Sequence, residues 1–221
     1  TPTYSTFVTS NVEGSDQRVG GLIGYQSSGS VTNAQMTGTV TGWTTGSTIN
    51  YASNYTGGIG GYITGNISYS RYTGSLVKGG YMTGGLVGQT DNSISNSYVT
   101  GAVTANNAYV GGLMGYGQYI SSSYNTGDVS ASNNFVGGLA GQATGAITNS
   151  YASGRVTGLI DGSTINYAGT FVGGLAGYDN YYIADSYYIG SLVKGGHQTG
   201  GLVGHTDHHI YRSYATGAYS G

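Results

Sequence analysis

The sequence predicts an all-β protein, a single-stranded, right-handed β-solenoid (β-helix) of about seven to eight coils with about 27 residues each. The first observation behind this prediction is a phrase of the type Gly-Gly-Leu-x-Gly. It begins at Gly20, Gly57, Gly84, Gly111, Gly137, Gly173 and Gly200. A recurrence at this spacing is typical of stacked supersecondary units rather than of one globular core. The second observation is that the apolar runs are short, are separated by glycine and lack helical spacing, which favours strands.

Alignment of the units on this phrase brings similar residues into columns. About ten residues after the first glycine stands Val or Ile, then a small residue that is mostly Ser, and then an aromatic column with Tyr98, Tyr124, Tyr151, Tyr187 and Tyr214. The last apolar column consists of Val40, Leu76, Val103, Val129, Val156, Leu192 and Tyr219. We expect about three strands per unit, with glycines at corners that accept positive φ and let successive coils approach closely.

A longer repeat is superimposed on the first. Residues 46–52 recur unchanged at 162–168, and residues 75–80 recur at 191–196, in both cases displaced by 116 residues. The segment 46–52 lies in an insertion of about ten residues. We therefore expect one domain, residues 1–221, that consists of a partial coil (1–19), a four-coil super-unit (20–136) and a second, incomplete super-unit (137–221).

The composition excludes several classes of partner. The net charge is −2 and the six basic residues are scattered, whereas nucleic-acid binding needs clustered Lys and Arg. The absence of Cys excludes disulfides and thiolate metal sites. No apolar run reaches the length of a membrane span, so we expect no membrane insertion.

Two groups of aromatic residues are candidates for binding. One is expected to protrude with the insertions, either to bind a partner or to cover a sheet edge, and comprises Trp43, Tyr51, Tyr55, Tyr167 and Phe171. The other is a column that follows the glycine phrase, in which Tyr25, Tyr62, Tyr116 and Tyr178 alternate with Gln89, Gln142 and His205. Aromatic rings among neutral hydrogen-bonding side chains suit sugars, and packing without a ligand is the alternative.

Metal binding and catalysis have weaker signals. His205, Asp207, His208 and His209 cluster near the C-terminal end and could bind a transition metal, but they fall in a variable turn where adventitious binding is expected. The glycine phrases lack the strand–loop–helix context of a phosphate-binding loop. No nucleophile–base pair or carboxylate pair stands out, so we expect neither enzymatic activity nor a cofactor.

The repeat carries a family resemblance that covers nearly the whole chain. Residues 84–88, Gly-Gly-Leu-Val-Gly, followed by residues 94–101, Ile-Ser-Asn-Ser-Tyr-Val-Thr-Gly, resemble the GLUG repeat. Residues 147–154 and 213–217 are similar to the same motif. The resemblance implies a β-solenoid module of a large secreted or surface-bound bacterial protein of the adhesin type. It implies no catalytic residues.

These observations predict a non-enzymatic, extracellular cell-surface module of an adhesin or fibre that contacts glycans or neighbouring copies of itself. A self-assembling filament of subunits stacked end to end is the alternative. A third hypothesis, ice binding, is suggested by a rank of threonines. That rank is single and is interrupted by Ser153 and Ile189; its members are Thr37, Thr73, Thr100, Thr126 and Thr216.

Overall fold

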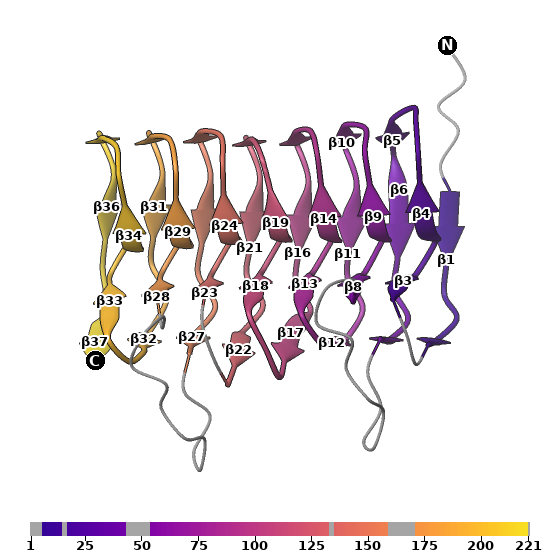
Figure 1. The fold of residues 1–221 in the computed structure, drawn as a ribbon, viewed down its shortest axis with the longest axis horizontal. Coiled ribbons are helices and arrows are strands. Elements are labelled where there is room, and N and C mark those ends of the chain that lie inside the picture. Colours follow the sequence, from indigo (N-terminus) through magenta and orange to yellow (C-terminus); the bar gives the residue numbers. More distant parts are fainter. Residues whose placement is uncertain (1–5, 15–16, 43–53, 133–134, 159–170, 221) are drawn as a thin grey trace.

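The computed structural model describes residues 6–14, 17–42, 54–132, 135–158 and 171–220, which form strands and turns and contain no helix. The chain coils about one long axis and adds a strand to each of five parallel sheets in turn (Figure 1). This arrangement confirms the predicted β-solenoid. It corrects the expected three strands per unit, since a full coil contributes five, most of them only two to four residues long. No helix in the described part of the chain is long and apolar enough to cross a membrane.

We name the sheets A to E. Sheet A consists of β1 (Thr6–Val8), β6 (Ala34–Met36), β11 (Arg71–Tyr72), β16 (Tyr98–Val99), β21 (Tyr124–Asn125), β26 (Tyr151–Ala152), β31 (Tyr187–Tyr188) and β36 (Tyr214–Ala215). Sheet B consists of β2 (Val12–Glu13), β7 (Val40–Thr41), β12 (Leu76–Gly79), β17 (Ala102–Ala105), β22 (Val129–Ala131), β27 (Val156–Thr157), β32 (Leu192–Lys194) and β37 (Ala218–Ser220).

The remaining sheets have seven strands each. Sheet C consists of β3 (Arg18–Gly20), β8 (Tyr55–Gly57), β13 (Met82–Gly84), β18 (Tyr109–Gly111), β23 (Phe135–Gly137), β28 (Phe171–Gly173) and β33 (Gln198–Gly200). Sheet D consists of β4 (Ile23–Gln26), β9 (Gly60–Ile63), β14 (Val87–Thr90), β19 (Met114–Gly117), β24 (Ala140–Ala143), β29 (Ala176–Asp179) and β34 (Val203–Thr206). Sheet E consists of β5 (Val31–Thr32), β10 (Ile67–Ser68), β15 (Ile94–Ser95), β20 (Ile120–Ser121), β25 (Ile147–Thr148), β30 (Ile183–Ala184) and β35 (Ile210–Tyr211).

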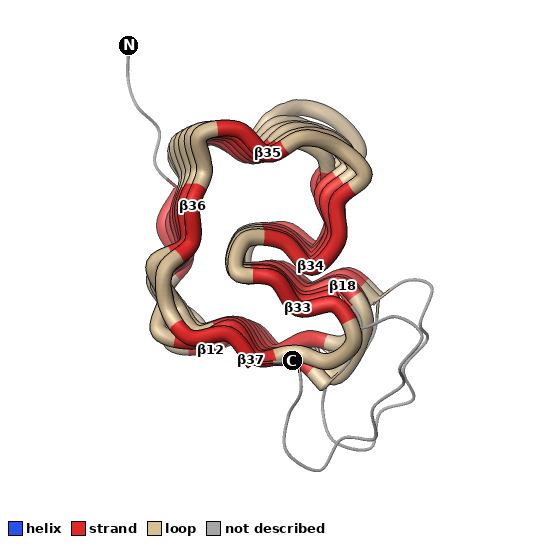
Figure 2. The backbone as a smooth tube through the Cα atoms, turned by 90° about the vertical axis from the view of Figure 1, so that its left-hand side faces the viewer, coloured by secondary structure: helices blue, strands red, loops and turns tan. Residues whose placement is uncertain are grey.

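The glycine phrase lies at the centre of the coil rather than at an outer corner. In the end view, the strands of sheets C and D run into the interior and back out, joined by a turn that carries the phrase (Figure 2). We call these two strands and their turn the infold. In the fourth copy, a Cβ on Gly112 would overlap the carbonyl oxygen of Gly138 and the buried amide of Asn125. A Cβ on Gly115 would lie 2.6 Å from the backbone nitrogen of Thr83 in sheet C.

The glycines are therefore required for close packing of backbone on backbone. The expected positive φ is wrong for the phrase, because the only glycines with positive φ among the described residues are Gly29 and Gly217. The left-handed conformation occurs instead at the corner between sheets E and A, once per coil. It is adopted by Asn33, Tyr69, Asn96, Ser122, Asn149, Asp185 and Arg212, with φ between 41° and 55°. Asn and Asp tolerate this conformation better than other non-glycine residues.

A serine follows six of these seven corners and explains the column of small residues, while Ala34 follows the first. The serine is buried in each of these coils except the last, where Ser213 is partly exposed. The hydroxyl of Ser123 donates to the carbonyl oxygen of Ser121 at 2.8 Å and accepts from the backbone N–H of Ser97 in the preceding coil at 3.1 Å. Ser70, Ser97, Ser150 and Ser186 repeat both bonds. This serine ladder satisfies backbone groups that the two-residue strands leave unpaired at the corner.

The hydrophobic core agrees with the predicted columns, with one correction. Ile94, Leu113, Val129 and their equivalents are buried, as expected. Leu76 and Leu192, however, are not the inward members of the last apolar column: Val77 pairs with Val40 and Val103, and Val193 pairs with Val156 and Tyr219.

The reason for this shift is a buried tyrosine in each of these coils. The hydroxyl oxygen of Tyr72 lies 2.7 Å from the carbonyl oxygen of Leu76 and 2.9 Å from that of Gly38. Tyr188 makes the same two contacts, to Leu192 and Gly154. These coils have one more residue at the corner than their neighbours, which makes room for the ring.

The serine ladder predicts a stability effect. We expect Ser123→Ala to lower the free energy of unfolding by about 1–3 kcal/mol, because it leaves the buried N–H of Ser97 without an acceptor. Ser121→Ala is the matched control, since this position faces outward and the equivalent residue in a later coil is Ala184. Denaturant unfolding of both variants tests the ladder, and equal stabilities would contradict it.

The infold predicts a second effect. We expect Gly115→Ala to destabilise the protein by about 3 kcal/mol, because the new methyl group would overlap backbone atoms that cannot rotate away. At the equivalent position of the first coil, Gly24 is exposed, and a Cβ there would contact only the Arg18 carbonyl oxygen, at 3.0 Å. Gly24→Ala should therefore cost less than about 1 kcal/mol. Thermal and denaturant unfolding would decide, and similar costs for both variants would argue against the steric explanation.

Candidate functional site

The mouth of the infold brings two columns of side chains together. Sheet C contributes Arg18, Tyr55, Met82, Tyr109, Phe135, Phe171 and Gln198. Sheet D contributes Tyr25, Tyr62, Gln89, Tyr116, Gln142, Tyr178 and His205. Each residue of the first column precedes its neighbour in the second column by seven positions in the sequence, and the glycine phrase lies between the two residues. We call the two columns together the aromatic stripe.

The sheet D column was predicted from the sequence, whereas the sheet C column was not. The structure confirms that Tyr25, Tyr62, Tyr116 and Tyr178 occupy one register position with Gln89, Gln142 and His205. The seven-residue spacing across the phrase was the signal that could have revealed the second column. An outer corner, as expected for the phrase, would separate the two strands, whereas the infold pairs them.

The rings of the stripe meet at an angle between sheets C and D, whereas along sheet C the rings of Tyr109, Phe135 and Phe171 are stacked at 4.8 and 5.0 Å between centroids. Tyr109 meets Tyr116 edge-on at 5.8 Å between ring centroids, and Tyr55 lies 5.5 Å from Tyr62 at an interplanar angle of 33°. Within its own column, Tyr116 is flanked by Gln89 and Gln142 rather than by other rings. Tyr25 is 47% exposed, and its ring carries the Arg18 guanidinium at 4.2 Å from the centroid.

The second set of tyrosines, on sheet A, forms a longer and uninterrupted stack. Tyr98, Tyr124, Tyr151, Tyr187 and Tyr214 form a ladder with 4.9–5.3 Å between successive centroids and interplanar angles of 7° or less. The ring faces between Tyr98 and Tyr214 therefore cover each other and are not open to a ligand. The aromatic column of the aligned repeats is thus a stacked ladder, and its role in the structure is cross-strand packing.

Two carboxylates lie at the edge of the stripe and accept hydrogen bonds from it. The Tyr62 hydroxyl donates to one oxygen of Asp91 at 2.5 Å, and the Gln89 amide donates to the other at 3.2 Å. Burial of the Tyr62 ring, together with this carboxylate, raises the pKa of the phenol to about 12. Tyr62 is therefore protonated, and remains a donor, throughout the physiological pH range.

The same arrangement occurs four coils further on. The Tyr178 hydroxyl donates to one oxygen of Asp207 at 2.5 Å, and His205 Nε2 lies 3.0 Å from the other. His205 Nδ1 is 3.1 Å from the Gln198 side-chain oxygen, so the ring is held at both nitrogens. The hydrogen bonds from Tyr178 and His205 hold the pKa of the Asp207 carboxyl below its usual value.

The predicted metal-binding cluster is only partly brought together. His205 lies in β34 beside Asp207, while His208 packs against Tyr181 and His209 against Tyr211. Among the residues that the structure describes, no group of three or more His, Cys, Asp or Glu side chains could hold a metal ion. His205 belongs to a hydrogen-bonded pair with Asp207 rather than to an exposed turn, which corrects the expectation for this residue.

The structure describes only some of the candidate binding residues that were expected to protrude with the insertions. Trp43, Tyr51 and Tyr167 lie outside the described residues. Tyr55 and Phe171 were expected to protrude with the insertions, and this is wrong: both lie in strands, where Tyr55 pairs with Arg18 and Met82 and Phe171 with Phe135 and Gln198. Both rings are members of the aromatic stripe.

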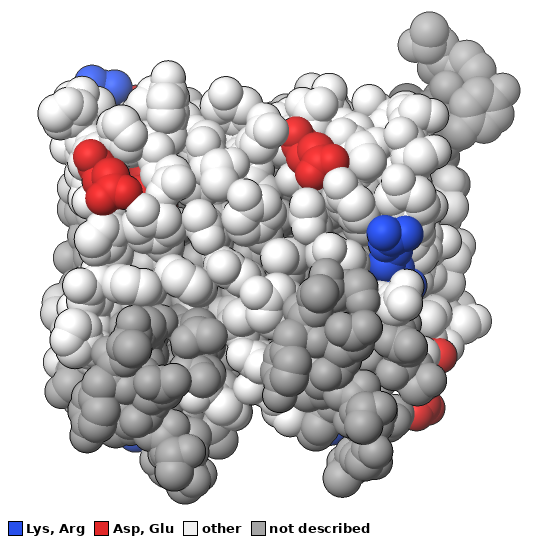
Figure 3. Space-filling view, viewed as in Figure 1, with Lys and Arg blue, Asp and Glu red and all other residues white. Residues whose placement is uncertain are grey.

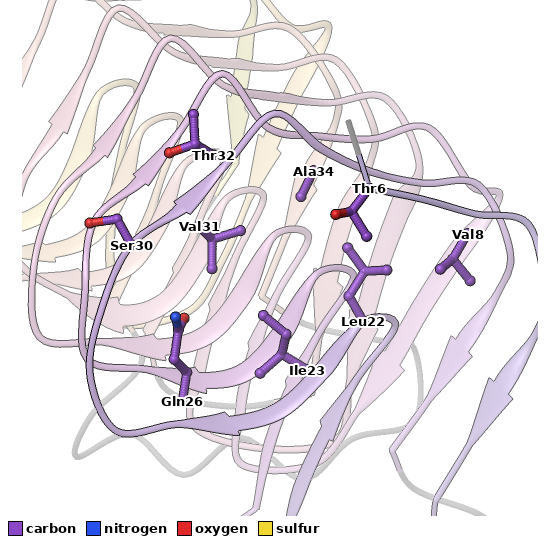
Figure 4. A pocket seen from close by; sticks show the side chains of 9 residues that line it. All are labelled: Thr6, Val8, Leu22, Ile23, Gln26, Ser30, Val31, Thr32 and Ala34. Atoms are coloured by element: carbon purple, nitrogen blue, oxygen red, sulfur yellow. The ribbon is translucent and has the colours of Figure 1, made fainter. Parts of the chain in front are cut away.

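A cavity of about 460 Å³ opens at the N-terminal edge of the solenoid. It is lined by Thr6, Val8, Leu22, Ile23, Gln26, Ser30, Val31, Thr32 and Ala34 (Figure 4). The apolar members continue columns that are buried in the later coils, and none of the lining side chains is titratable. We therefore assign this cavity to the end of the hydrophobic core and not to a ligand site.

Asp179 is a buried carboxylate next to the stripe. It follows Tyr178 in β29, is fully buried, and neither carboxylate oxygen has a hydrogen-bond partner of normal geometry among the described residues. Burial raises the pKa of Asp179 to about 7, an effect that the backbone amide of Tyr181 only partly offsets. The equivalent residues in adjacent coils are Ala143 and Thr206, so the position does not require an acid.

Comparison with known proteins identifies the repeat. The model of the GLUG motif matches residues 15–41, 79–104 and 132–157, which fall in three different coils. No curated protein and no solved structure matches the chain.

Asp179 predicts a pH-dependent stability. Because its pKa is higher in the folded than in the unfolded state, the folded protein retains this proton between about pH 4 and pH 7, and the free energy of unfolding falls as the pH rises through that range. Asp179→Thr should therefore stabilise the protein at pH 8 by on the order of 4 kcal/mol and have little effect at pH 4.

The measurement is denaturant unfolding at the two pH values, with Glu13→Gln as the control for an exposed carboxyl group. A gain in stability that is the same at pH 4 and at pH 8 would show that packing, and not the charge, is responsible.

Proposed function

We propose that this chain, a β-solenoid built of GLUG repeats, is a non-enzymatic, extracellular cell-surface module of an adhesin or fibre whose aromatic stripe contacts neutral glycans. The proposal depends on one observation above all. The stripe combines partly exposed rings with amide and hydroxyl groups along the whole length of the solenoid. Sugars bind through their apolar ring faces and their hydroxyl groups, and these side chains offer a partner for each.

Charge supports the choice of neutral glycans. Charged residues make up 6% of the sequence, and the face that carries the stripe is largely uncharged (Figure 3). Among the described residues, Arg18 lies at one end of the stripe, and the exposed acids Asp91 and Asp207 bind to its side chains. An acidic glycan would meet these two carboxylates, which disfavours binding.

The solenoid also suits an extended scaffold. Each coil adds about 4.8 Å along the axis and presents one more pair of stripe residues at the same angular position. Repeat proteins commonly use such elongated surfaces for binding. The threonine rank is less suited to ice binding, since it lies beside the stacked tyrosines of sheet A and not beside a second rank of threonines.

Glycan binding is tested with a glycan array and with affinity electrophoresis in gels that contain neutral polysaccharides. We expect the wild-type protein to bind and Tyr116→Ala to weaken binding on the order of tenfold, because this partly exposed ring lies in the middle of the stripe and has no other ring beside it in its own column. Tyr119→Ala is the matched control, a tyrosine that is 46% exposed outside the stripe. No binding by the wild type, or an equal loss in both variants, would sink the proposal.

A further inference from the structure

We infer that the aromatic stripe contains two equivalent saccharide subsites, one in each super-unit, that bind a neutral linear polysaccharide bivalently. Subsite 1 consists of Tyr55, Tyr62, Gln89 and Asp91, and subsite 2 of Phe171, Tyr178, His205 and Asp207. This inference rests on the proposed glycan contact and assigns it to particular residues.

The two subsites have the same construction. Each member of subsite 2 lies 116 residues after its counterpart in subsite 1, and each keeps the same chemical role. An aromatic ring lies beside a tyrosine, at 5.5 Å in subsite 1 and 6.0 Å in subsite 2. The hydroxyl of that tyrosine binds one carboxylate oxygen, and a nitrogen of Gln89 or His205 binds the other.

The carboxylate distinguishes these two places from the rest of the stripe. In the other coils the position equivalent to Asp91 and Asp207 holds Ser27, Thr64, Gln118, Thr144 and Asn180. The next two residues of the turn differ between the super-units, Asn92 and Ser93 in one and His208 and His209 in the other, whereas the Tyr–Asp pair is the same in both. Figure 3 correspondingly shows two separate acidic patches in the upper half of a largely uncharged face.

The chemistry of each subsite fits a sugar with adjacent hydroxyl groups. A carboxylate has about four acceptor positions, and the internal bonds of Asp91 and Asp207 use two of them. The remaining positions face solvent, since the side chain of Asp207 is 55% exposed and Asp91 is exposed as well. Sugar hydroxyls can donate there while the apolar face of the sugar packs on the neighbouring ring. The fixed negative charge disfavours uronic and sialic acids.

The spacing favours a polymer. The subsites are four coils apart, which corresponds to about 19 Å along the solenoid axis. Tyr109, Tyr116 and Phe135 continue the stripe between them, so a linear chain can run along the stripe from one carboxylate to the other. Once one subsite is occupied, the second binds its part of the same chain at a high effective concentration, which raises the affinity for the polymer above that for a short fragment.

The test uses isothermal titration with the neutral polysaccharide that the array identifies and with a disaccharide or trisaccharide cut from it. We expect two short fragments to bind per wild-type chain, one per chain in Asp91→Asn and one in Asp207→Asn, and none in the double variant. Each single variant should bind the polymer about tenfold or more weakly. Asp128→Asn, at an exposed acid outside the stripe, should leave every value unchanged.

The outcomes separate the inference from the proposed function. If Tyr116→Ala weakens binding but both Asp variants bind like the wild type, the glycan contact stands and the paired subsites are overturned. One fragment per wild-type chain, or a polymer affinity no higher than that of the fragment, overturns them as well. If no neutral polysaccharide binds, both the proposed glycan contact and the paired subsites are overturned. Unfolding curves of the Asp variants should match the wild type, because both side chains are exposed, so a loss of binding cannot be attributed to misfolding.

Discussion

The structure depends on one steric constraint, the contact of backbone with backbone inside the infold. Sheets C and D pass so close to each other that the third glycine of each phrase faces the backbone of sheet C directly. The second glycine faces an inward side chain of sheet A, such as Tyr72 or Asn125. Side chains at the second and third glycine positions would force the strands of the infold apart from their neighbours. With glycine there, the leucine at the tip of the turn is buried at the centre of the molecule, and the two outer columns of the infold lie next to each other.

A coil made of very short strands leaves some buried backbone polar groups without a partner in a strand. At the corner between sheets E and A, the repeat pairs these groups with the side chain of a serine. The left-handed residue turns the chain, and the serine after it bonds both along the chain and across to the preceding coil. Buried tyrosines and Asn125 act in the same way where the interior column changes size, since their polar atoms reach backbone groups. The position of Asp179 is different, because neither of its buried oxygens has a partner of normal geometry among the described residues.

Much of this fold could be predicted from the sequence because stacking in register gives equivalent positions equivalent surroundings. A column of Ile or Ser is therefore visible in the aligned repeats themselves. The five strands per coil could not be predicted, because a two-residue strand has no periodicity to detect. Leu76 and Val77 are both apolar, so the extra corner residue beside Tyr72 could not be located. Tyr55 and Phe171 follow the insertions directly, which hides the point where the register resumes. The bond from Tyr62 to Asp91 crosses between coils and depends on that register.

The two sets of tyrosines show how the same residue type serves two purposes on one scaffold. On sheet A, tyrosines in five successive coils give rings that cover each other at 4.9–5.3 Å, and stacking stabilises the sheet. In the stripe, the rings of sheet C stack from Tyr109 to Phe171, whereas glutamine and histidine interrupt the tyrosine column of sheet D. This interruption gives up stacking energy in sheet D and places hydrogen-bonding side chains beside the rings. A sheet D column that served packing alone would gain by continuing the stack, so its irregularity is itself an argument that the stripe has a ligand.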